Sequence, residues 1–515
     1  MDLNILSLLI WSPVIGIGII LLIPRDNAAL IKITAAASTG IQLCFAILLW
    51  TKFDTGFSGF QFQEELSWIP SFNIHYFLGV DGLSLPMVFL TALLSFLCIF
   101  VSWKTEKAVK GYFALFLLLD AGMMGVFLSL DFFLFYVFWE VMLLPMYFLI
   151  GIWGGPKKEY AAIKFFLYTL AGSVLMLIAI LALYFTCGKT FNMVELMALA
   201  PSALAGGLWW GIESIKVIWL LLFIAFAIKV PIFPFHTWLP LAHVEAPTAV
   251  SVILAGVLLK MGTYGILRIS YPMIPDGTIW FAGALAVLAL INIIWGAMCA
   301  LAQTDLKKMV AYSSISHMGY VLLGMAAVVA AGAKHGVNFT AAEAGMNGAV
   351  LQMFNHGTIT AMLFILVGVI YDRAHHRNID NFGGLGVKMP IYTGIVALAF
   401  FAGLGLPGLS GFIGEALCFI GAFPVYRTIV IISALGILLN AAYFLWSFQR
   451  IFLGKLNDKY ADLPEINGRE IFTLVPLAVL VILLGVYPTP VLDVMKTTMA
   501  GLIEIIQNSS LLALH

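Results

Sequence analysis

Runs of about 20 apolar residues recur along almost the whole chain, and a helix of that length spans the hydrocarbon core of a bilayer. The sequence of 515 residues is 62% hydrophobic and only 10% charged, whereas soluble domains contain about 25% charged residues. No water-soluble fold can bury so much apolar surface. The chain is therefore predicted to be an all-α polytopic membrane protein.

The apolar runs predict about fourteen transmembrane helices in one membrane domain, residues 1–515. The first run lacks the basic start and small-residue cleavage site of a signal peptide, so it is predicted to be a retained span. The tail 489–515 is short and polar, which predicts an interfacial segment. The predicted spans lie near residues 3–23, 29–50, 80–102, 111–130, 132–153, 161–186, 215–235, 247–270, 279–301, 309–331, 345–370, 390–423, 428–452 and 471–488.

Lysine and arginine gather in alternate loops, and loops of this kind face the inner side of a membrane. The asymmetry predicts that both termini lie on the outer side. The predicted inner loops hold Arg25, Lys32, Lys104, Lys107, Lys110, Lys157, Lys158, Lys307, Lys308, Arg373, Arg377, Lys388, Arg450, Lys455, Lys459 and Arg469, whereas the outer loops hold Lys52, Lys189, Arg268, Lys334, Arg427 and Lys496.

Prolines and glycines interrupt the seventh and twelfth predicted spans, at Pro231–Pro240 and at Gly403–Gly414. Proline removes a backbone donor, and broken backbone at membrane depth persists only inside protein or beside water. Interrupted helices at corresponding places in two halves indicate an inverted-repeat transporter. The positions of the breaks therefore predict two inverted five-helix repeats, at residues 111–270 and 279–452.

Six ionisable residues lie inside these apolar spans, where each charge at a helix centre costs roughly 2.5–3.5 kcal/mol on insertion scales. Polar residues accompany them at helical spacing, for example Ser313 and Tyr320 near His317. A polar stripe on an apolar helix is predicted to face the protein interior, where it can hold water. The six residues are Glu140, Lys229, Lys260, His317, His356 and Glu415.

These residue types predict a proton relay. Burial lowers the proton affinity of a lysine and a nearby carboxylate restores it, so a change at Glu140 would alter proton binding at Lys229. Lys260 has no carboxylate in its own span and is predicted to act as a shuttle. Histidines titrate near neutral pH and suit the intermediate steps, and Glu415 would exchange protons with one side.

Structural interpretations stay open at several positions. Glu140 and Lys229 could form a buried pair without a role in conduction, and His317 and His356 could each make a helix–helix hydrogen bond. Lys164 is predicted to extend toward the surface, although a functional role stays open. Asp131 is predicted to cap a helix at the outer surface.

Other motifs narrow the chemistry. His236 and His243 lack the spacing of a zinc site and are interpreted as part of a shaped loop beside the broken helix; with Lys164 they are the accessory candidates. No G-x-x-x-x-G-K-[ST] loop is present, and no G-x-G-x-x-G opens a strand–helix unit, which argues against ATP hydrolysis and nicotinamide binding. The five cysteines are scattered, so redox chemistry is expected on another chain. The net charge of zero predicts no binding to nucleic acid.

Three segments closely resemble the antiporter-like membrane subunits of respiratory complex I and of the multi-subunit cation/proton antiporters, and the resemblance covers essentially the whole chain. It implies fourteen helices and two inverted repeats. It also implies that Glu140 and Lys229 are a coupled pair, that Lys260 is the central shuttle, and that His317 and His356 link it to Glu415. The three segments are Gly79-Val-Asp-Gly-Leu-Ser-Leu-Pro86, Pro234-Phe-His-Thr-Trp-Leu-Pro-Leu-Ala-His-Val-Glu-Ala-Pro-Thr248 and Asp305-Leu-Lys-Lys-Met-Val-Ala-Tyr-Ser-Ser-Ile-Ser-His-Met-Gly319.

Within this family the chain most resembles the M-type chains of bacterial NADH–quinone oxidoreductase. Glu415 stands where the sister chains L and N carry a lysine, and the chain ends without the long lateral helix of chain L. The resemblance implies a bacterial inner membrane with both termini periplasmic and sister antiporter-like chains on either side. It places NADH, FMN, iron–sulfur clusters and quinone on partner subunits, with no cofactor on this chain.

Two other functions stay open at this point. The chain could belong to a stand-alone monovalent cation/proton antiporter, in which an ion gradient and not a redox reaction supplies the energy. It could also be a non-conducting scaffold, and in that case replacing Lys260 would leave proton pumping intact.

Overall fold

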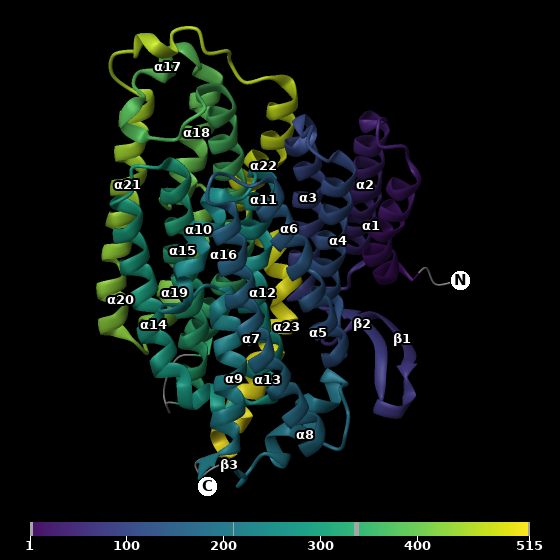
Figure 1. Ribbon diagram of the computed structural model, residues 1–515. Coiled ribbons are helices and arrows are strands. Elements are labelled where there is room, and N and C mark those ends of the chain that lie inside the picture. Colours follow the sequence, from purple (N-terminus) through teal and green to yellow (C-terminus); the bar gives the residue numbers. More distant parts are fainter. Residues whose placement is uncertain (1–3, 210, 334–338, 513–515) are drawn as a thin grey trace.

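Long helices run side by side through the molecule (Figure 1). The structure, a computed structural model, describes residues 4–209, 211–333 and 339–512. Within these ranges, 11 helices are long and apolar enough to cross a membrane, and three shorter apolar helices accompany them. The prediction of an all-α polytopic membrane protein is confirmed, whereas the number of fourteen spans stays a prediction.

The predicted spans correspond to helices whose bounds differ by a few residues from the expected ones. The helices are α1 Ile5–Leu22, α2 Ala28–Lys52, α3 Ser84–Val101, α4 Val109–Leu128, α5 Phe132–Val141, α6 Leu143–Trp153, α7 Lys158–Thr186, α8 Met193–Ala203, α9 Ser214–Lys229, α10 Trp238–Glu245, α11 Thr248–Ile253, α12 Leu259–Gly265, α13 Tyr271–Met273, α14 Pro275–Leu301, α15 Leu306–Ala333, α16 Phe339–Ala374, α17 Leu385–Lys388, α18 Pro390–Gly403, α19 Ser410–Ala422, α20 Arg427–Ser433, α21 Leu435–Phe452, α22 Gly468–Val486 and α23 Thr489–Leu512. The strands are β1 Gln61–Ile69, β2 Ile74–Val80, β3 Leu208–Trp209 and β4 Ile212–Glu213.

The two interrupted spans are broken where the sequence predicts. Helix α9 ends at Lys229, two cis prolines follow at Pro231 and Pro234, and the chain resumes as α10 at Trp238. Helix α18 ends at Gly403 and α19 begins at Ser410. Both breaks place polar side chains inside the bundle, with His236 buried at the first break and Ser410 buried at the second.

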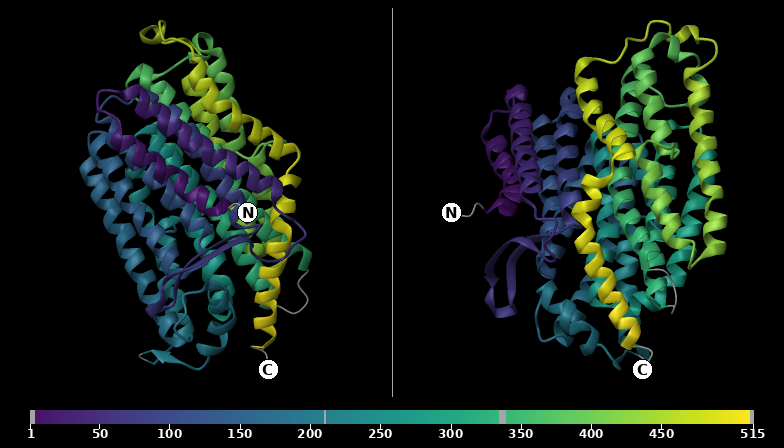
Figure 2. Two further views of the ribbon diagram at one scale, coloured as in Figure 1. Left: turned by 90° about the vertical axis from the view of Figure 1, so that its right-hand side faces the viewer. Right: turned by 180° about the vertical axis from the view of Figure 1, so that it is seen from behind.

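The loops gather at two opposite ends of the bundle. Backbone hydrogen bonds at one end join Gly155 to Glu245, Leu306 to Arg377 and Gly384 to Leu453, so the loops predicted to be inner share this end, which we call the basic end. The β1–β2 hairpin, α8 and the end of α23 lie at the other end (Figures 1 and 2). The predicted outer-loop residue Lys334 lies outside the described residues.

The first helix begins beside the hairpin, because the Leu6 backbone N–H donates to Oε1 of Glu64 in β1 over 2.8 Å. The start of α1 and the end of α23 therefore both lie toward the end opposite the basic end.

Asp131 caps the start of α5, and its Oδ1 accepts from the backbone N–H groups of Phe133 and Leu134 at 2.9 and 3.0 Å. The prediction that Asp131 caps a helix is confirmed.

The predicted tail segment is the helix α23, which follows α22 directly (Figure 2). One face is buried against the bundle, including Val494, Met495 and Met499. Oγ1 of Thr498 accepts a hydrogen bond of 2.9 Å from the backbone N–H of Gly82, before α3. The tail is thus an amphipathic helix fixed to the bundle, and its location at a membrane interface stays a prediction.

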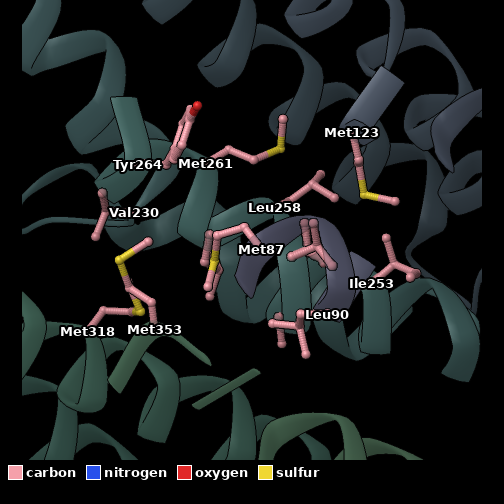
Figure 3. Close-up of a cluster of buried hydrophobic side chains, with 14 of the residues drawn as sticks. Met87, Leu90, Met123, Val230, Ile253, Leu258, Met261, Tyr264, Met318 and Met353 are labelled. Carbon is pink, nitrogen blue, oxygen red and sulfur yellow. The ribbon is translucent and has the colours of Figure 1, made fainter. Parts of the chain in front are cut away.

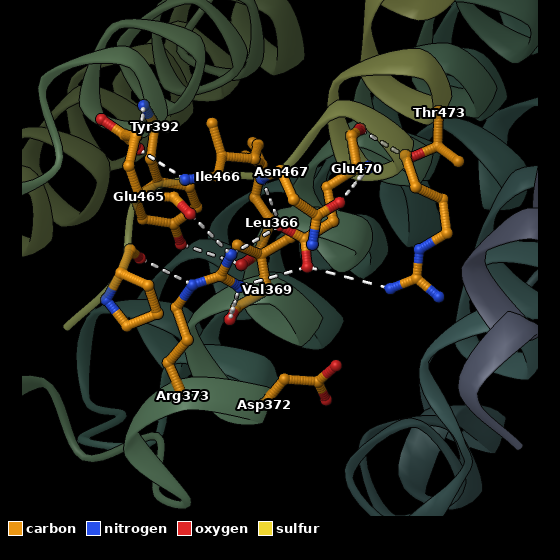
Figure 4. A network of polar contacts seen from close by, with 12 residues as sticks. Leu366, Val369, Asp372, Arg373, Tyr392, Glu465, Ile466, Asn467, Glu470 and Thr473 are labelled. Carbon is orange, nitrogen blue, oxygen red and sulfur yellow. Dashed lines mark hydrogen bonds and ion pairs between the residues drawn. The ribbon is translucent and has the colours of Figure 1, made fainter. Parts of the chain in front are cut away.

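A polar network fastens α22 to α16 at the basic end (Figure 4). Nη2 of Arg373 lies 2.7 Å from Oε2 of Glu470, and both side chains are more than nine-tenths buried. Arg373 also donates to the backbone carbonyls of Pro464 and Glu465, while the carboxylate of Glu465 accepts from the backbone of Tyr392 at the start of α18. The network therefore holds three helices at fixed separations.

Replacing Glu470 with glutamine should lower the free energy of unfolding by about 3 kcal/mol, because Arg373 would stay buried without its carboxylate. The measurement is thermal unfolding in detergent, followed by the reaction of the buried Cys98, Cys187 and Cys418 with a fluorogenic thiol reagent. Lys104→Gln is the matched control, since the Lys104–Asp372 pair is 3.6 Å long and exposed and such pairs contribute at most about 1 kcal/mol. Equal shifts in both variants would contradict this prediction.

Candidate functional site

The predicted relay residues lie inside the bundle. The exposed fraction is 0% for Lys260, 1% for Lys229, 2% for His356, and 4% for both His317 and Glu415. Glu140 is half-buried. None of the six faces lipid as a fully exposed side chain, which agrees with the prediction that this polar stripe faces inward.

Lys260 lies in α12, between two π-helical segments at Leu254–Leu258 and Ile266–Ser270. Such π-turns are frequent at functional sites. Its Nζ donates to the carbonyl oxygen of Ala255 and lies 2.7 Å from Nδ1 of His356. The partners of this buried amine are therefore neutral groups, and among the described residues no carboxylate pairs with it.

A line of contacts leads from Lys260 to Glu415 across three further helices. The ring of His356 in α16 lies with its centroid 5.7 Å from that of His317 in α15. Nδ1 of His317 lies 2.9 Å from Oε1 of Glu415 in α19. Nε2 of each histidine has no hydrogen-bond partner among the described residues. Each ring thus has one nitrogen engaged along the line and the other free.

Glu415 sits beside the break between α18 and α19. Nε2 of Gln352 donates to Oε1 of Glu415 over 3.3 Å. A Cβ atom at Gly405 would lie 3.2 Å from Oε2, and Gly405 has a φ of +81°. Glycine is favoured at this position for both reasons, since it adopts positive φ without strain and leaves room for the carboxylate.

Lys229 and Glu140 are arranged differently. Nζ of Lys229 lies 4.9 Å from the centroid of the Trp139 ring, within cation–π range. Lys229 and Glu140 interact electrostatically, but in the described part of the chain they form no direct ion pair. Nζ of Lys229 and Oε1 of Glu140 both lack hydrogen-bond partners there. Glu140 and Lys229 are therefore coupled through their charges, without a direct contact.

Apolar side chains directly follow three of the relay residues in the sequence. Val230, Met261 and Met318 directly follow Lys229, Lys260 and His317 in the sequence, and they belong to one buried apolar cluster with Met353 (Figure 3). Helix α12 approaches α9 closely at Gly262. The described residues provide no hydrogen-bonded bridge from Lys229 to Lys260, in contrast to the continuous contacts from Lys260 to Glu415.

The three accessory candidates all lie near the break after α9. Nε1 of Trp295 donates to Nε2 of His236 over 3.4 Å, and Lys164 acts on His236 electrostatically. Lys164 is half-buried, with Nζ 5.7 Å from the centroid of the Tyr168 ring. His243 is fully buried. That Lys164 extends toward the surface stays a prediction.

The sequence interpretation missed two buried cations by assigning them to loops. Nη2 of Arg268 donates to Asp81 over 2.5 Å, inside the eighth span. Both side chains are buried, so each compensates the charge of the other. Lys307 is 5% exposed. Asp81 belongs to the motif Gly79–Pro86, and that motif was the available signal for the first of these cations.

Lysines, histidines and glutamates aligned through the interior of a bundle of membrane-length helices are typical of proteins that move protons or small cations. The described residues include no group of three His, Cys, Asp or Glu side chains placed to hold a metal ion. The geometry thus defines a polytopic membrane protein with a buried line of proton-binding groups.

The chain belongs to the NADH:quinone oxidoreductase/Mrp antiporter transmembrane family, whose model matches residues 129–440. NADH-quinone oxidoreductase subunit M of Rhodobacter capsulatus is 42% identical, with 97% of this chain and 96% of that protein covered. This similarity confirms the family that the three motifs indicate and its M-type branch, which Glu415 indicates.

Two solved structures share the fold. A chain of respiratory complex I from Thermus thermophilus matches with a TM-score of 0.83 and 28% identity, covering 98% of this chain and 99% of that chain. A chain of the Mrp complex from Dietzia sp. DQ12-45-1b matches with a TM-score of 0.84 and 23% identity, covering 98% and 100%. The second likeness concerns the fold alone.

Replacing Glu415 with leucine should lower the free energy of unfolding by about 1–2 kcal/mol, because His317 and Gln352 lose their shared acceptor. Replacing Glu140 with leucine should cost less, since its Oε1 has no hydrogen-bond partner. Thermal unfolding in detergent compares the two variants. A larger loss for Glu140→Leu would contradict the assigned geometry.

Proposed function

We propose that this chain is a proton-translocating membrane subunit of NADH:quinone oxidoreductase and that protons move along the line Glu140, Lys229, Lys260, His356, His317 and Glu415. The observation that carries the proposal is the contact between the buried Lys260 and Nδ1 of His356, at 2.7 Å. A buried amine bound only by neutral groups exchanges its proton readily, because its charged form is poorly stabilised.

The second half of the line transfers protons through its two imidazoles. Nζ of Lys260 donates a proton to Nδ1 of His356, and the free Nε2 of His356 releases a proton toward Nε2 of His317. Nδ1 of His317 then donates to Oε1 of Glu415, 2.9 Å away. Each imidazole accepts on one nitrogen and donates from the other, so its tautomer reverses with each passage and is restored by a ring rotation or a return transfer.

The first half controls the second through charge. Glu140 and Lys229 interact electrostatically without contact. Protonating Glu140 removes the charge that stabilises the Lys229 ammonium, which favours release of a proton from Lys229 toward Lys260. Because the described residues provide no hydrogen-bonded bridge between these lysines, the transfer requires water between them, and this step is where conduction can be gated.

The proposed topology is supported by the two helix breaks and by the distribution of lysine and arginine. The breaks after α9 and α18 fit inverted repeats at residues 111–270 and 279–452. The gathering of Lys and Arg at one end of the bundle supports an inner location of that end, with both termini periplasmic. The tail 489–515 would then lie at the outer interface.

The chain is a subunit of a larger membrane complex. The partners are the other complex I membrane subunits, with the sister antiporter-like chains on either side, and the lipid bilayer. A bacterial inner membrane is supported by the relative from Rhodobacter capsulatus. Redox chemistry with NADH, FMN, iron–sulfur clusters and quinone would take place on partner subunits.

A cation/proton antiporter subunit is the second candidate, because the Mrp complex shares the fold. The 42% identity to an NADH-quinone oxidoreductase subunit favours the first candidate. Neighbouring genes discriminate between them: quinone-reductase genes support the first, and short antiporter genes support the second.

Glu140→Gln and Lys229→Ala should each reduce NADH-driven proton uptake about tenfold or more, because each removes one charge of the coupled pair. Uptake is measured in inside-out vesicles and normalised to the amount of assembled complex. Normal uptake in both variants would count against the relay.

Gly262→Ala should also slow proton uptake, because the added Cβ would lie 2.7 Å from the Phe226 carbonyl oxygen and 3.0 Å from the Val230 nitrogen and would separate α12 from α9. The matched control is Gly283→Ala in α14, where a Cβ meets nothing within 4 Å. The prediction is an uptake reduced severalfold in the first variant only. Unchanged uptake in an assembled Gly262→Ala complex would show that the spacing of these helices does not limit transfer.

A further inference from the structure

Asp120 in α4 is fully buried, and among the described residues it has no ionic partner. Two other aspartates are buried there, Asp81 and Asp131. The charge of Asp81 is compensated by Arg268. The carboxylate of Asp131 accepts hydrogen bonds from three backbone N–H groups, one of which belongs to His75. Asp120 has neither kind of support, and an ionised carboxylate without it is strongly disfavoured in an apolar interior.

The hydrogen bonds around Asp120 leave one of its carboxyl oxygens unpartnered. Oγ of Ser95 in α3 donates to Oδ1 of Asp120 over 2.6 Å, whereas Oδ2 has no partner within the described ranges. The side chain of Gln42 in α2 also interacts with the Asp120 carboxyl. Its Nε2 donates to the carbonyl oxygen of Leu9 in α1 over 3.0 Å, and its Oε1 lacks a partner in the same ranges. Two interacting side chains thus each keep a buried acceptor without a donor, which is rare in native structures.

The elements that pack against α4 offer Asp120 no positive charge. These elements are the helices α1, α2, α3, α5, α6 and α12 and the strand β2. Cys98 in α3 interacts electrostatically with Asp120, but a thiol carries no positive charge. In the part of the chain that the structure describes, no lysine, arginine or histidine of these elements acts on Asp120, and neither does Glu140 of α5. An ionised Asp120 would therefore be an isolated anion, whereas a neutral carboxylic acid has one donor to offer.

We propose that Asp120 binds a proton at Oδ2 and keeps it, as a neutral carboxylic acid that donates to Oε1 of Gln42. One proton then supplies the donor that both unpartnered oxygens lack. The resulting chain of hydrogen bonds runs from Ser95 through Asp120 and Gln42 to Leu9, and so connects α3, α4, α2 and α1.

The bound proton fastens the first two helices to the rest of the molecule. Helices α1 and α2 lie at the edge of the bundle (Figure 2), so they are held from one side only within this chain. The proton at Asp120 is separate from the protons of the relay, because in the described residues Asp120 shares no hydrogen bond with Glu140, Lys229 or Lys260.

Infrared spectroscopy of the assembled complex tests the proton. Aspartate labelled with carbon-13 in its side-chain carboxyl should shift a carbonyl stretching band of a protonated carboxylic acid at neutral pH. The band should disappear in Asp120→Asn. Asp131→Asn is the matched control and should keep the band, because the three N–H groups that bind Asp131 stabilise its ionised form.

Hydrogen–deuterium exchange of α1 and α2 in the assembled complex tests the fastening. Asp120→Asn keeps one donor and one acceptor in the same shape, so exchange at neutral pH should match that of the unchanged chain. Asp120→Leu removes both and should raise exchange in these helices about fivefold, the effect of one lost hydrogen bond. At alkaline pH the unchanged chain should exchange faster than Asp120→Asn at the same pH, because deprotonation leaves an uncompensated anion and asparagine does not titrate.

Each outcome decides one part of the proposal. A missing acid band, or a band that Asp120→Asn leaves in place, overturns the bound proton. A band that sodium chloride removes at constant pH means that the site holds a cation, which also overturns the bound proton. Equal exchange in Asp120→Leu and the unchanged chain overturns the fastening. None of these measurements depends on proton pumping, so the proposed function is tested separately.

Discussion

The cost of burying charge in an apolar bundle determines how this molecule is built. Lys260 has no exposed surface and, within the described ranges, no carboxylate partner, so its amine depends on the carbonyl of Ala255 and on Nδ1 of His356. That dependence couples α12 to α16, and through His317 and Glu415 to α15 and α19. Asp81 and Arg268 compensate their buried charges by forming a direct ion pair, which connects the start of α3 to the eighth span.

The line of ionisable groups is uneven, and the unevenness has a functional consequence. Between Lys260 and Glu415 the groups lie in contact or within one ring spacing. Between Lys229 and Lys260 the described residues form no hydrogen-bonded bridge, and the helices α12 and α9 pack closely at Gly262. A relay with one continuous half and one interrupted half is suited to control, because hydration of a single short segment then decides whether a proton passes.

Much of this arrangement could be predicted from the sequence. Runs of apolar residues mark the helices because the bilayer fixes their length, and prolines mark the two breaks because they remove backbone donors. Burial of Lys229, Lys260 and Glu415 follows from their apolar surroundings. The contact between His317 and Glu415, 98 residues apart, could not be predicted from local pattern, since no spacing rule relates two helices so distant along the chain.

The assignment of lysines and arginines to loops was the least accurate part of the sequence analysis. Arg268 and Lys307 stand near the ends of apolar runs, where a cation can either extend to water or turn inward to a partner. Only the fold supplies Asp81 to the first and the Ala246 carbonyl to the second. The adjacent lysines 307 and 308 take opposite directions, because successive residues on a helix point about 100° apart.

The account stands on a continuous hydrated route from Lys229 to Glu415 in the working enzyme. A density map of the assembled complex, at a resolution that shows ordered water, tests it directly. The account predicts water bound to Nζ of Lys229 and to Oε1 of Glu140, with a file of water reaching Lys260 in at least one state of turnover. A segment between Val230 and Met261 that stays dry and closed in every state would contradict it.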